Sequence, residues 1–263
     1  MLRSLLTAAA VIAITLPAVG AAQTVDELVA RNVAARGGGD AWRSVKSLKI
    51  SGTMGLGRGM FVPYAMELQR PHKMRFEFVF NGQTAVQTID GKSGWKLAPF
   101  LGRIDPEPMT EAELRESADM ASIDGLLFDY KARGHKIELE GRTKVNGKDA
   151  FKLKVTLPAG AVRRVYLDAD TGLELKMEAK RKRGKREWLV ETYYQDWKET
   201  AGLLIPHRQE TRAEGRKKSH LFFVAEVRVN PPLEQARFGK PASVAPKAAA
   251  IQPAAATGGK RGK

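Results

Sequence analysis

Residues 60–80 read MFVPYAMELQRPHKMRFEFVF, two runs in which apolar and polar side chains alternate on either side of Arg70–Pro71. A period of two is typical of strands that bury one face, and a proline between two such runs favours a turn. Aromatic and β-branched side chains suit a half-buried sheet. These residues therefore predict a β-hairpin with a wide apolar face, formed by Val62, Tyr64, Met66, Leu68, Met74, Phe76, Phe78 and Phe80.

Alternation of the same kind continues on both sides of this hairpin. It predicts a strand over residues 48–54, and further strands after the turn signals Asn81–Gly82 and Asp90–Gly91. A second series of alternating segments covers residues 137–229. We predict roughly ten or eleven strands with short connections, which makes the chain an α+β protein dominated by antiparallel sheet.

Two helical regions accompany the predicted sheet. Thr24 and Glu27 have the spacing of a capping box, and they begin an amphipathic segment over residues 25–36 that ends at consecutive glycines. Asp40 is placed to cap a short second helix. Over residues 99–134 the alternation stops, which predicts one or two helices lying across the sheet.

The two ends of the chain differ in composition from the middle. Residues 1–22 have a basic start, a short apolar run and small residues before the next position, as in a secretory signal peptide cleaved near Ala22. Residues 241–263 are rich in Ala, Pro, Gly and Lys without apolar periodicity, which is typical of a disordered basic tail. We therefore expect residues 23–240 to form one domain that is exported to the periplasm.

The residue types present leave little room for catalysis or metal binding. The chain has no cysteine, which excludes disulfides, thiolate metal sites and cysteine nucleophiles. Its four histidines are isolated from one another, and no G-x-S-x-G sequence is present to position a serine nucleophile. We therefore expect no catalytic residue, no metal and no cofactor.

One motif nevertheless resembles a catalytic one. Asp168, Asp170 and Thr171 follow an apolar strand in the pattern D-x-D-x-T, which is the nucleophile motif of haloacid-dehalogenase-type phosphotransferases. That chemistry needs a strand that leads into a helix, whereas Gly172 is followed by another alternating segment. The motif therefore favours a hairpin turn whose side chains bond to their own backbone, with a phosphotransferase that uses Asp168 and Asp170 as the alternative.

The positive charge indicates an anionic partner surface. The formal net charge is +15, and +10 of it falls in residues 23–240. Export disfavours nucleic acid, whereas anionic lipid attracts each nearby Lys or Arg by about 1 kcal/mol. The densest cluster allows two interpretations, a solvated hairpin loop or a contact with an anionic membrane surface, and it consists of Lys180, Arg181, Lys182, Arg183, Lys185 and Arg186.

The apolar face of the sheet also has two interpretations. It is either an ordinary closed core or the wall of a cavity that holds an apolar ligand. The long series of strands offers more apolar surface than two short helical groups can cover, and Met and Phe side chains adapt to variable ligands. This surplus favours the cavity.

The order of these segments resembles the LolA/LolB/LppX-like family of exported lipoprotein and lipid carriers. The resemblance covers about residues 24–240, and the segments YYQDW at 193–197, LLIPH at 203–207 and VNPP at 229–232 are similar to an uncharacterised periplasmic branch of this family. It implies an incomplete antiparallel β-barrel, or half-barrel, with helices covering its concave face.

The resemblance also implies a function. We expect a soluble, monomeric, non-enzymatic carrier or chaperone that takes part in lipoprotein sorting and transport by binding lipid or an acylated lipoprotein. The alternative is an envelope binding or scaffold module that has a closed core and acts through its basic loop. Residues 123–128 and the N-terminal helix would form a lid. The expected cavity residues are Tyr64, Met66, Leu68, Met74, Phe76, Phe78, Phe80, Trp95, Leu126, Phe128, Phe151, Leu153 and Val155.

Overall fold

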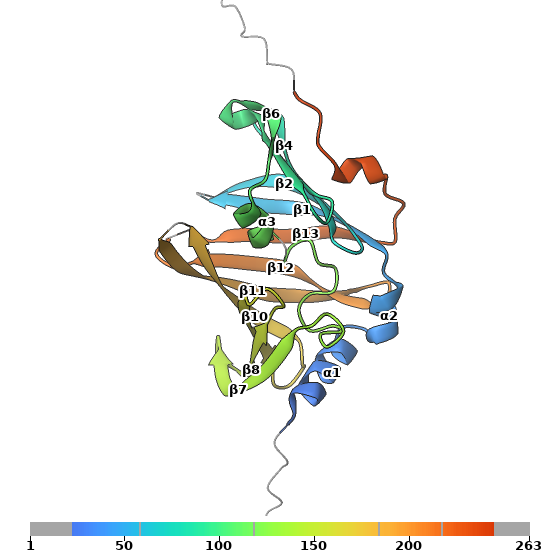
Figure 1. Ribbon diagram of the computed structural model, residues 1–263. Helices are drawn as coiled ribbons and strands as arrows, with labels where there is room; N and C mark the ends of the chain where they lie inside the picture. Colours follow the sequence, from blue (N-terminus) through green and yellow to red (C-terminus); the bar gives the residue numbers. More distant parts are fainter. Residues whose placement is uncertain (1–22, 58, 118, 184, 217, 245–263) are drawn as a thin grey trace, which may run out of the picture.

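One open antiparallel sheet organises the whole protein (Figure 1). The computed structural model describes residues 23–57, 59–117, 119–183, 185–216 and 218–244. Over these residues the sheet has thirteen strands in the order β6-β5-β4-β3-β2-β1-β13-β12-β11-β10-β9-β8-β7. The expected half-barrel is confirmed, and the strands are more numerous than the ten or eleven predicted.

The strands form two meanders that meet in the middle of the sheet. The first meander comprises β1 (Ser47–Gly57), β2 (Met60–Gln69), β3 (Lys73–Phe80), β4 (Gln83–Ile89), β5 (Gly94–Ala98) and β6 (Arg103–Pro108). The second comprises β7 (Lys136–Val145), β8 (Lys148–Thr156), β9 (Val162–Asp168), β10 (Glu174–Arg183), β11 (Arg186–Thr200), β12 (Leu203–Ala213) and β13 (His220–Val229). Strands β1 and β13 join the two, with Leu48 opposite Val229 and Met54 opposite Phe222.

This topology places the two edge strands at opposite ends of the sheet although they are neighbours in the sequence. The segment between β6 and β7, residues 109–135, therefore has to cross a face of the sheet to connect them. Figure 1 shows this segment in green, crossing the concave face with helix α3 (Glu111–Ser117). We call residues 109–135 the insert.

The N-terminal helices cover the second meander. Helix α1 (Val25–Ala35) begins with the predicted capping box, in which the Thr24 side chain accepts from the Glu27 backbone while the Glu27 side chain accepts in return. Helix α2 (Gly39–Ser44) follows directly. The predicted cap at Asp40 is wrong, because the helix begins at Gly39 and Gly38 holds the N-cap position.

The predicted helical region, residues 99–134, contains one α-helix, within the one or two predicted. This helix ends at Ser117, and residues 119–134 form successive turns. Strand β6 was not predicted, because Pro106 and Pro108 make its sequence resemble a loop. Proline is tolerated there because β6 is an edge strand, with a neighbouring strand of the sheet on one side only.

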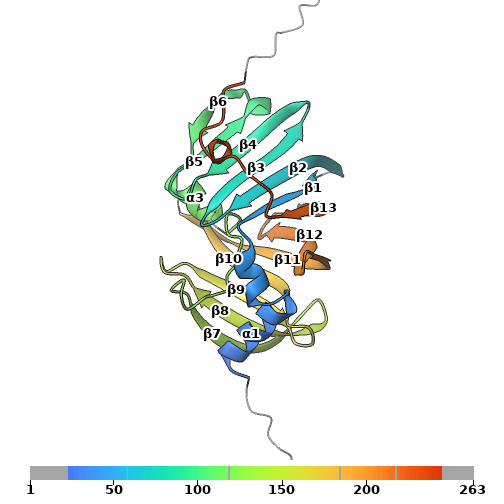
Figure 2. The ribbon, with the colours of Figure 1, turned by 90° about the vertical axis from the view of Figure 1, so that its right-hand side faces the viewer.

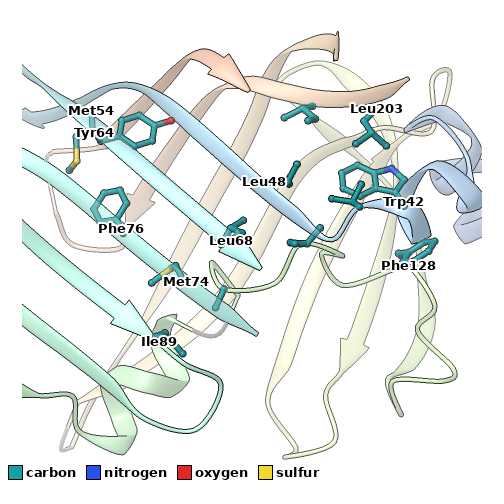
Figure 3. Packing of buried hydrophobic residues seen from close by; sticks show 14 of the residues in the cluster. Trp42, Leu48, Met54, Tyr64, Leu68, Met74, Phe76, Ile89, Phe128 and Leu203 are labelled. Atoms are coloured by element: carbon teal, nitrogen blue, oxygen red, sulfur yellow. The ribbon is translucent and has the colours of Figure 1, made fainter. Parts of the chain in front are cut away.

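The residues of the hairpin over residues 60–80 lie on the faces that the alternation predicted. Figure 3 shows Tyr64, Phe76, Met74 and Ile89 on one face of neighbouring strands, while Trp42 and Phe128 lie together beside the helices. These side chains belong to one buried cluster centred on β1 to β3. A second buried cluster packs α1 and Leu127 against strands β8 and β9.

The convex face of the first meander carries a segment that the sequence did not predict. Residues 231–244 run across it and include the short 3-10 helix η2 (Gln235–Phe238), seen in red in Figure 2. Phe238 is 1% exposed, and Arg237 donates to both carboxylate oxygens of Glu67 at 2.7 and 3.2 Å. The Val244 amide continues the segment by donating to the carbonyl of Ile104.

Candidate functional site: a cavity beneath the insert

A cavity of about 650 Å³ lies between the concave face and the insert. Ligand cavities in proteins commonly span about 300–1,000 Å³. Both meanders contribute walls, and Arg36 at the end of α1, Trp42 of α2 and the insert close the remaining sides. The strand residues at the wall are Leu48, Ile50, Tyr64, Met66, Leu68, Ile89, Val165, Glu174, Met177, Arg181, Val190, Thr192, Tyr194, Trp197, Ile205, Pro206, Gln209, Thr211, Phe222 and Val224.

Cross-strand pairs make the middle of this wall apolar. Ile50 of β1 lies opposite Met66 of β2, and both line the cavity. The ring of Tyr64 meets Phe222 edge-on at a centroid distance of 5.3 Å, which fixes the wall where the two meanders join. Burial raises the pKa of Tyr64 to about 12, so the phenol is neutral at physiological pH. This part of the wall offers a hydrocarbon chain an uncharged surface.

The insert is attached to the first meander by close packing and an ion pair. The Lys96 ammonium of β5 lies 2.6 Å from the Glu113 carboxylate of α3. At Gly94 a Cβ atom would come within 2.8 Å of the side-chain ends of Met109 and Leu114, so a larger residue there would displace these side chains of the insert. Helix α3 is therefore held against the edge of the first meander.

The insert is also attached to the second meander, through Asp119. Asp119 accepts from the guanidinium groups of Arg163 and Arg181 at 3.0 and 3.3 Å. Within the insert, His135 bonds through Nδ1 to the carbonyl of Leu126 at 2.9 Å. Burial, the largest cause, lowers the pKa of His135, so its ring is neutral above pH 6.5. The insert therefore spans the cavity with contacts on both sides.

The α1 end of the cavity is polar and aromatic. The Arg36 guanidinium lies 4.4 Å from the Trp42 ring centroid and 5.9 Å from that of Trp197. It also pairs with the Glu174 carboxylate at 3.3 Å. Burial raises the pKa of Tyr194, and Glu174 raises it further, so this hydroxyl is neutral as well. Arg36 and Glu174 therefore act as each other's counter-charge at this end.

Glycine fixes the position of α1 over the sheet. Gly37 follows the helix with φ of +112°, and a Cβ there would lie 2.0 Å from the carbonyl oxygen of Gly202. This close approach lets the Leu204 amide donate to the Arg36 carbonyl at 3.0 Å. The predicted end of the helix at consecutive glycines is confirmed, and the β11–β12 turn explains why a side chain is not tolerated.

The structure brings some of the expected cavity residues to the cavity wall and places others beside it on the same face of the sheet. Tyr64, Met66, Leu68 and Leu126 line the cavity. Met74 and Phe76 lie in the buried cluster of the first meander. Phe78 and Phe80 each pack against the ring of Phe100, at centroid distances of 5.7 and 5.3 Å. Ligand contact by the residues beside the wall stays a prediction.

The remaining expected residues lie on other surfaces. Phe128 is buried beside Trp42, and Phe151, Leu153 and Val155 are buried under α1. Trp95 lies on the convex face, because it is paired with Thr88, whose hydroxyl donates to Gly239 of the convex segment. Lys240 covers the Trp95 ring at 4.9 Å. Alternation within one strand does not show which face of a sheet is concave. This is why Trp95 lies on the convex face and not on the predicted cavity wall.

Most of the residues that the second meander contributes to the cavity wall were not among the cavity residues predicted from the sequence. Thr192 and Thr211 face the cavity as a cross-strand pair with their hydroxyl oxygens 3.1 Å apart. Gln209 lines it on the same strand as Thr211, and Val224 lines it on the neighbouring strand β13. Side chains alternate between the two faces along residues 188–229, which was visible in the sequence. Because polar side chains such as Thr and Gln lie on the cavity-facing side, the alternation did not identify that side as a cavity wall.

The D-x-D-x-T motif forms the expected hairpin turn. One oxygen of the Asp168 carboxylate accepts from the backbone amides of Asp170 and Thr171 at 2.9 and 3.0 Å. Burial alone would raise the pKa of Asp168, but these two amides and Lys148 lower it below its usual range. Strand β9 continues into antiparallel β10, which is not the strand-to-helix setting of the phosphotransferase motif.

The basic cluster is the tip of the β10–β11 hairpin. Lys182, Lys185 and Arg186 are exposed, and Lys180 pairs with Glu187 at 2.8 Å. Arg183 ends β10, opposite Arg186. Arg181 differs from the rest, because its side chain is 17% exposed and lines the cavity. Membrane contact by this cluster stays a prediction.

Solved structures identify the fold. A LolA superfamily protein from Nitrosomonas europaea superposes with a TM-score of 0.55 at 10% identity, over 83% of this chain and 99% of that one. A DUF1329 family protein from Desulfovibrio piger gives 0.56 at 14% identity, over 82% and 97%. The chain has the LolA-like fold. A putative outer membrane lipoprotein-sorting protein domain from Vibrio parahaemolyticus shares it, with a TM-score of 0.53 at 14% identity, over 81% and 94%.

At the level of sequence, no protein-family model and no curated protein matches this LolA-like chain. None of the helices in the described ranges has the length and apolar character needed to cross a membrane.

Proposed function

We propose that this protein is an exported, non-enzymatic carrier that holds lipid, or the acyl chains of a lipoprotein, for transfer across the periplasm. The cavity between the concave face and the insert carries this proposal. An acyl chain exposed to water costs about 0.8 kcal/mol per methylene, so a lipid leaves its membrane only if another apolar surface receives it. The wall of Ile50, Met66 and Phe222 supplies such a surface.

The relatives in fold support the same function. The Vibrio parahaemolyticus protein of the same fold is a putative outer membrane lipoprotein-sorting protein domain, which supports the acyl chains of a lipoprotein as cargo here. A hydrophobic ligand needs only a cavity and a cover that admits it, without covalent chemistry. The insert provides the cover, and it is held by the ion pairs of Asp119 and by the burial of Leu127 and Phe128 in the two hydrophobic clusters.

Filling the cavity tests the proposal. Thr211 points into the cavity, whereas its neighbour Arg212 is exposed. We expect Thr211→Trp to weaken the binding of a fluorescent fatty acid by at least about tenfold, or about 1.4 kcal/mol, because the indole occupies the space of the ligand. The matched control Arg212→Trp adds the same side chain to the outside and should bind like the wild type.

The measurement is a fluorescence titration of purified protein, with circular dichroism and urea unfolding to verify that both variants fold. A wild type that takes up no fatty acid, or equal binding by Thr211→Trp and Arg212→Trp, would contradict the carrier function or its location in the cavity.

A further inference from the structure

Two buried cations share one anion at the side of the cavity. Arg163 donates through Nε and Arg181 through Nη2, and both bonds end on the same Oδ2 atom of Asp119. The side chains of Arg163, Asp119 and Arg181 are 6%, 12% and 17% exposed. Over the residues that the structure describes, Asp119 is the one carboxylate within 4 Å of either guanidinium. This group of three therefore has an excess positive charge.

Other carboxylates near the cavity do not remove this excess. Glu174 already pairs with Arg36 at the α1 end. Glu116 is exposed and acts on Arg181 only through longer-range attraction. Because an uncompensated charge in a poorly hydrated place is costly, such a charge is ordinarily paired. Burial lowers the pKa of Arg181, as expected for a cation that has lost part of its hydration.

The two arginines differ in what their remaining donors face. Arg163 bonds the backbone carbonyl of Val162 with Nη1 and does not line the cavity. Arg181 lines the cavity, and its bond to Asp119 is the longer of the two. Arg133 also lines the cavity, but its bonds go to Gly125, Phe128 and Ser122 within the insert. Arg181 therefore presents guanidinium donors to a ligand in the cavity.

We propose that Arg181 binds the anionic head group of the ligand, so the cargo is an amphiphile with a carboxylate or phosphate group. This inference rests on the proposed carrier function and specifies its substrate class. A guanidinium binds either group through two parallel hydrogen bonds. One added negative charge balances Arg163, Asp119 and Arg181. The tail then extends past Met177 and Val190 toward the apolar wall.

Ligands that differ only in their head group test this proposal. Isothermal titration calorimetry at pH 8 compares dodecanoate, dodecyl phosphate and dodecanol, all below their micellar concentrations. We expect wild-type protein to bind at least one of the two anions about tenfold or more tightly than dodecanol. A preference for dodecanoate or for dodecyl phosphate identifies which anion the site takes.

Variants then assign this preference to one side chain. Arg181→Gln should bind dodecanol like the wild type and lose the preference for the anion, whereas Arg181→Lys should keep part of it. The matched control Lys180→Gln removes the same charge from the exposed neighbour and should keep all of it. The inference fails if wild-type protein binds the alcohol as tightly as both anions, or if Arg181→Gln retains the preference. In either case binding of the alcohol still supports the carrier, whereas binding of none of the ligands overturns both proposals.

Discussion

Removing Asp119 should destabilise the protein far more than removing Arg181. Asp119→Asn keeps the shape of the side chain but leaves two guanidinium groups, 6% and 17% exposed, without a counter-charge. Breaking a buried ion pair by removing one partner costs about 3–5 kcal/mol. Because domains have about 5–15 kcal/mol of stability in total, this loss is large.

Arg181→Met should behave differently, because it removes the excess cation and leaves Asp119 paired with Arg163 at 3.0 Å. We expect its free energy of unfolding to lie within about 1 kcal/mol of the wild type, since replacing buried charge by apolar packing is often neutral or stabilising. In the double variant that combines Asp119→Asn with Arg181→Met, only the Arg163 guanidinium is left without a counter-charge. It should therefore recover about 0.5–3 kcal/mol of the loss caused by Asp119→Asn, which is the usual range of coupling between residues in contact.

The assay is urea unfolding of ligand-free protein at low salt, followed by tryptophan fluorescence and circular dichroism. Glu187→Gln is the control, because it removes a carboxylate from an exposed pair and should change stability by less than about 1 kcal/mol. An Arg181→Met variant as unstable as Asp119→Asn would refute the reasoning, since it would mean that both arginines are needed to balance the group.

Three further predictions concern other parts of the fold. Phe238→Ala should cost about 3–5 kcal/mol in urea unfolding because the ring is 1% exposed, whereas Leu101→Ala, at 62% exposed, should cost under about 1 kcal/mol. Burial lowers the pKa of His135, so the unfolded chain takes up a proton first and stability should fall as the pH decreases below 6.5. The same titration of His135→Asn should show a smaller decrease, and an equal decrease would assign the effect elsewhere. Gly37→Ala should destabilise more than Gly38→Ala in thermal unfolding, because both have positive φ but only the first meets a backbone atom; equal losses would argue against the close contact.

The sequence predicted the parts of the fold that depend on local patterns. Alternation over residues 60–80 places Tyr64, Met66 and Leu68 on the correct face, and the capping box at Thr24 begins α1 as expected. These signals are reliable because each involves residues close together in the chain. The D-x-D-x-T hairpin was predicted for the same reason.

Features that depend on distant residues could not be predicted in this way. The convex segment is held by Glu67 and Phe238, which are far apart in the sequence and carry no shared pattern. Arg181 belongs to the same face as Met177 and Ala179, but the surrounding basic residues suggested an exposed loop. Its partner Asp119 lies on the insert, and only the crossing of the sheet by the insert brings the two together.

The connection between β6 and β7 limits how the cavity can open. Both rims of the sheet are covalently joined by residues 109–135, so the insert has no free end that could swing away from the concave face. A ligand must therefore enter at the ends of the strands or displace the middle of the insert away from the sheet, between the two ends at which the insert joins β6 and β7. Because the number of residues in this connection is constant, a ligand that flattens the sheet also stretches the insert. The curvature of the sheet and the distance between the sheet and the insert therefore change together.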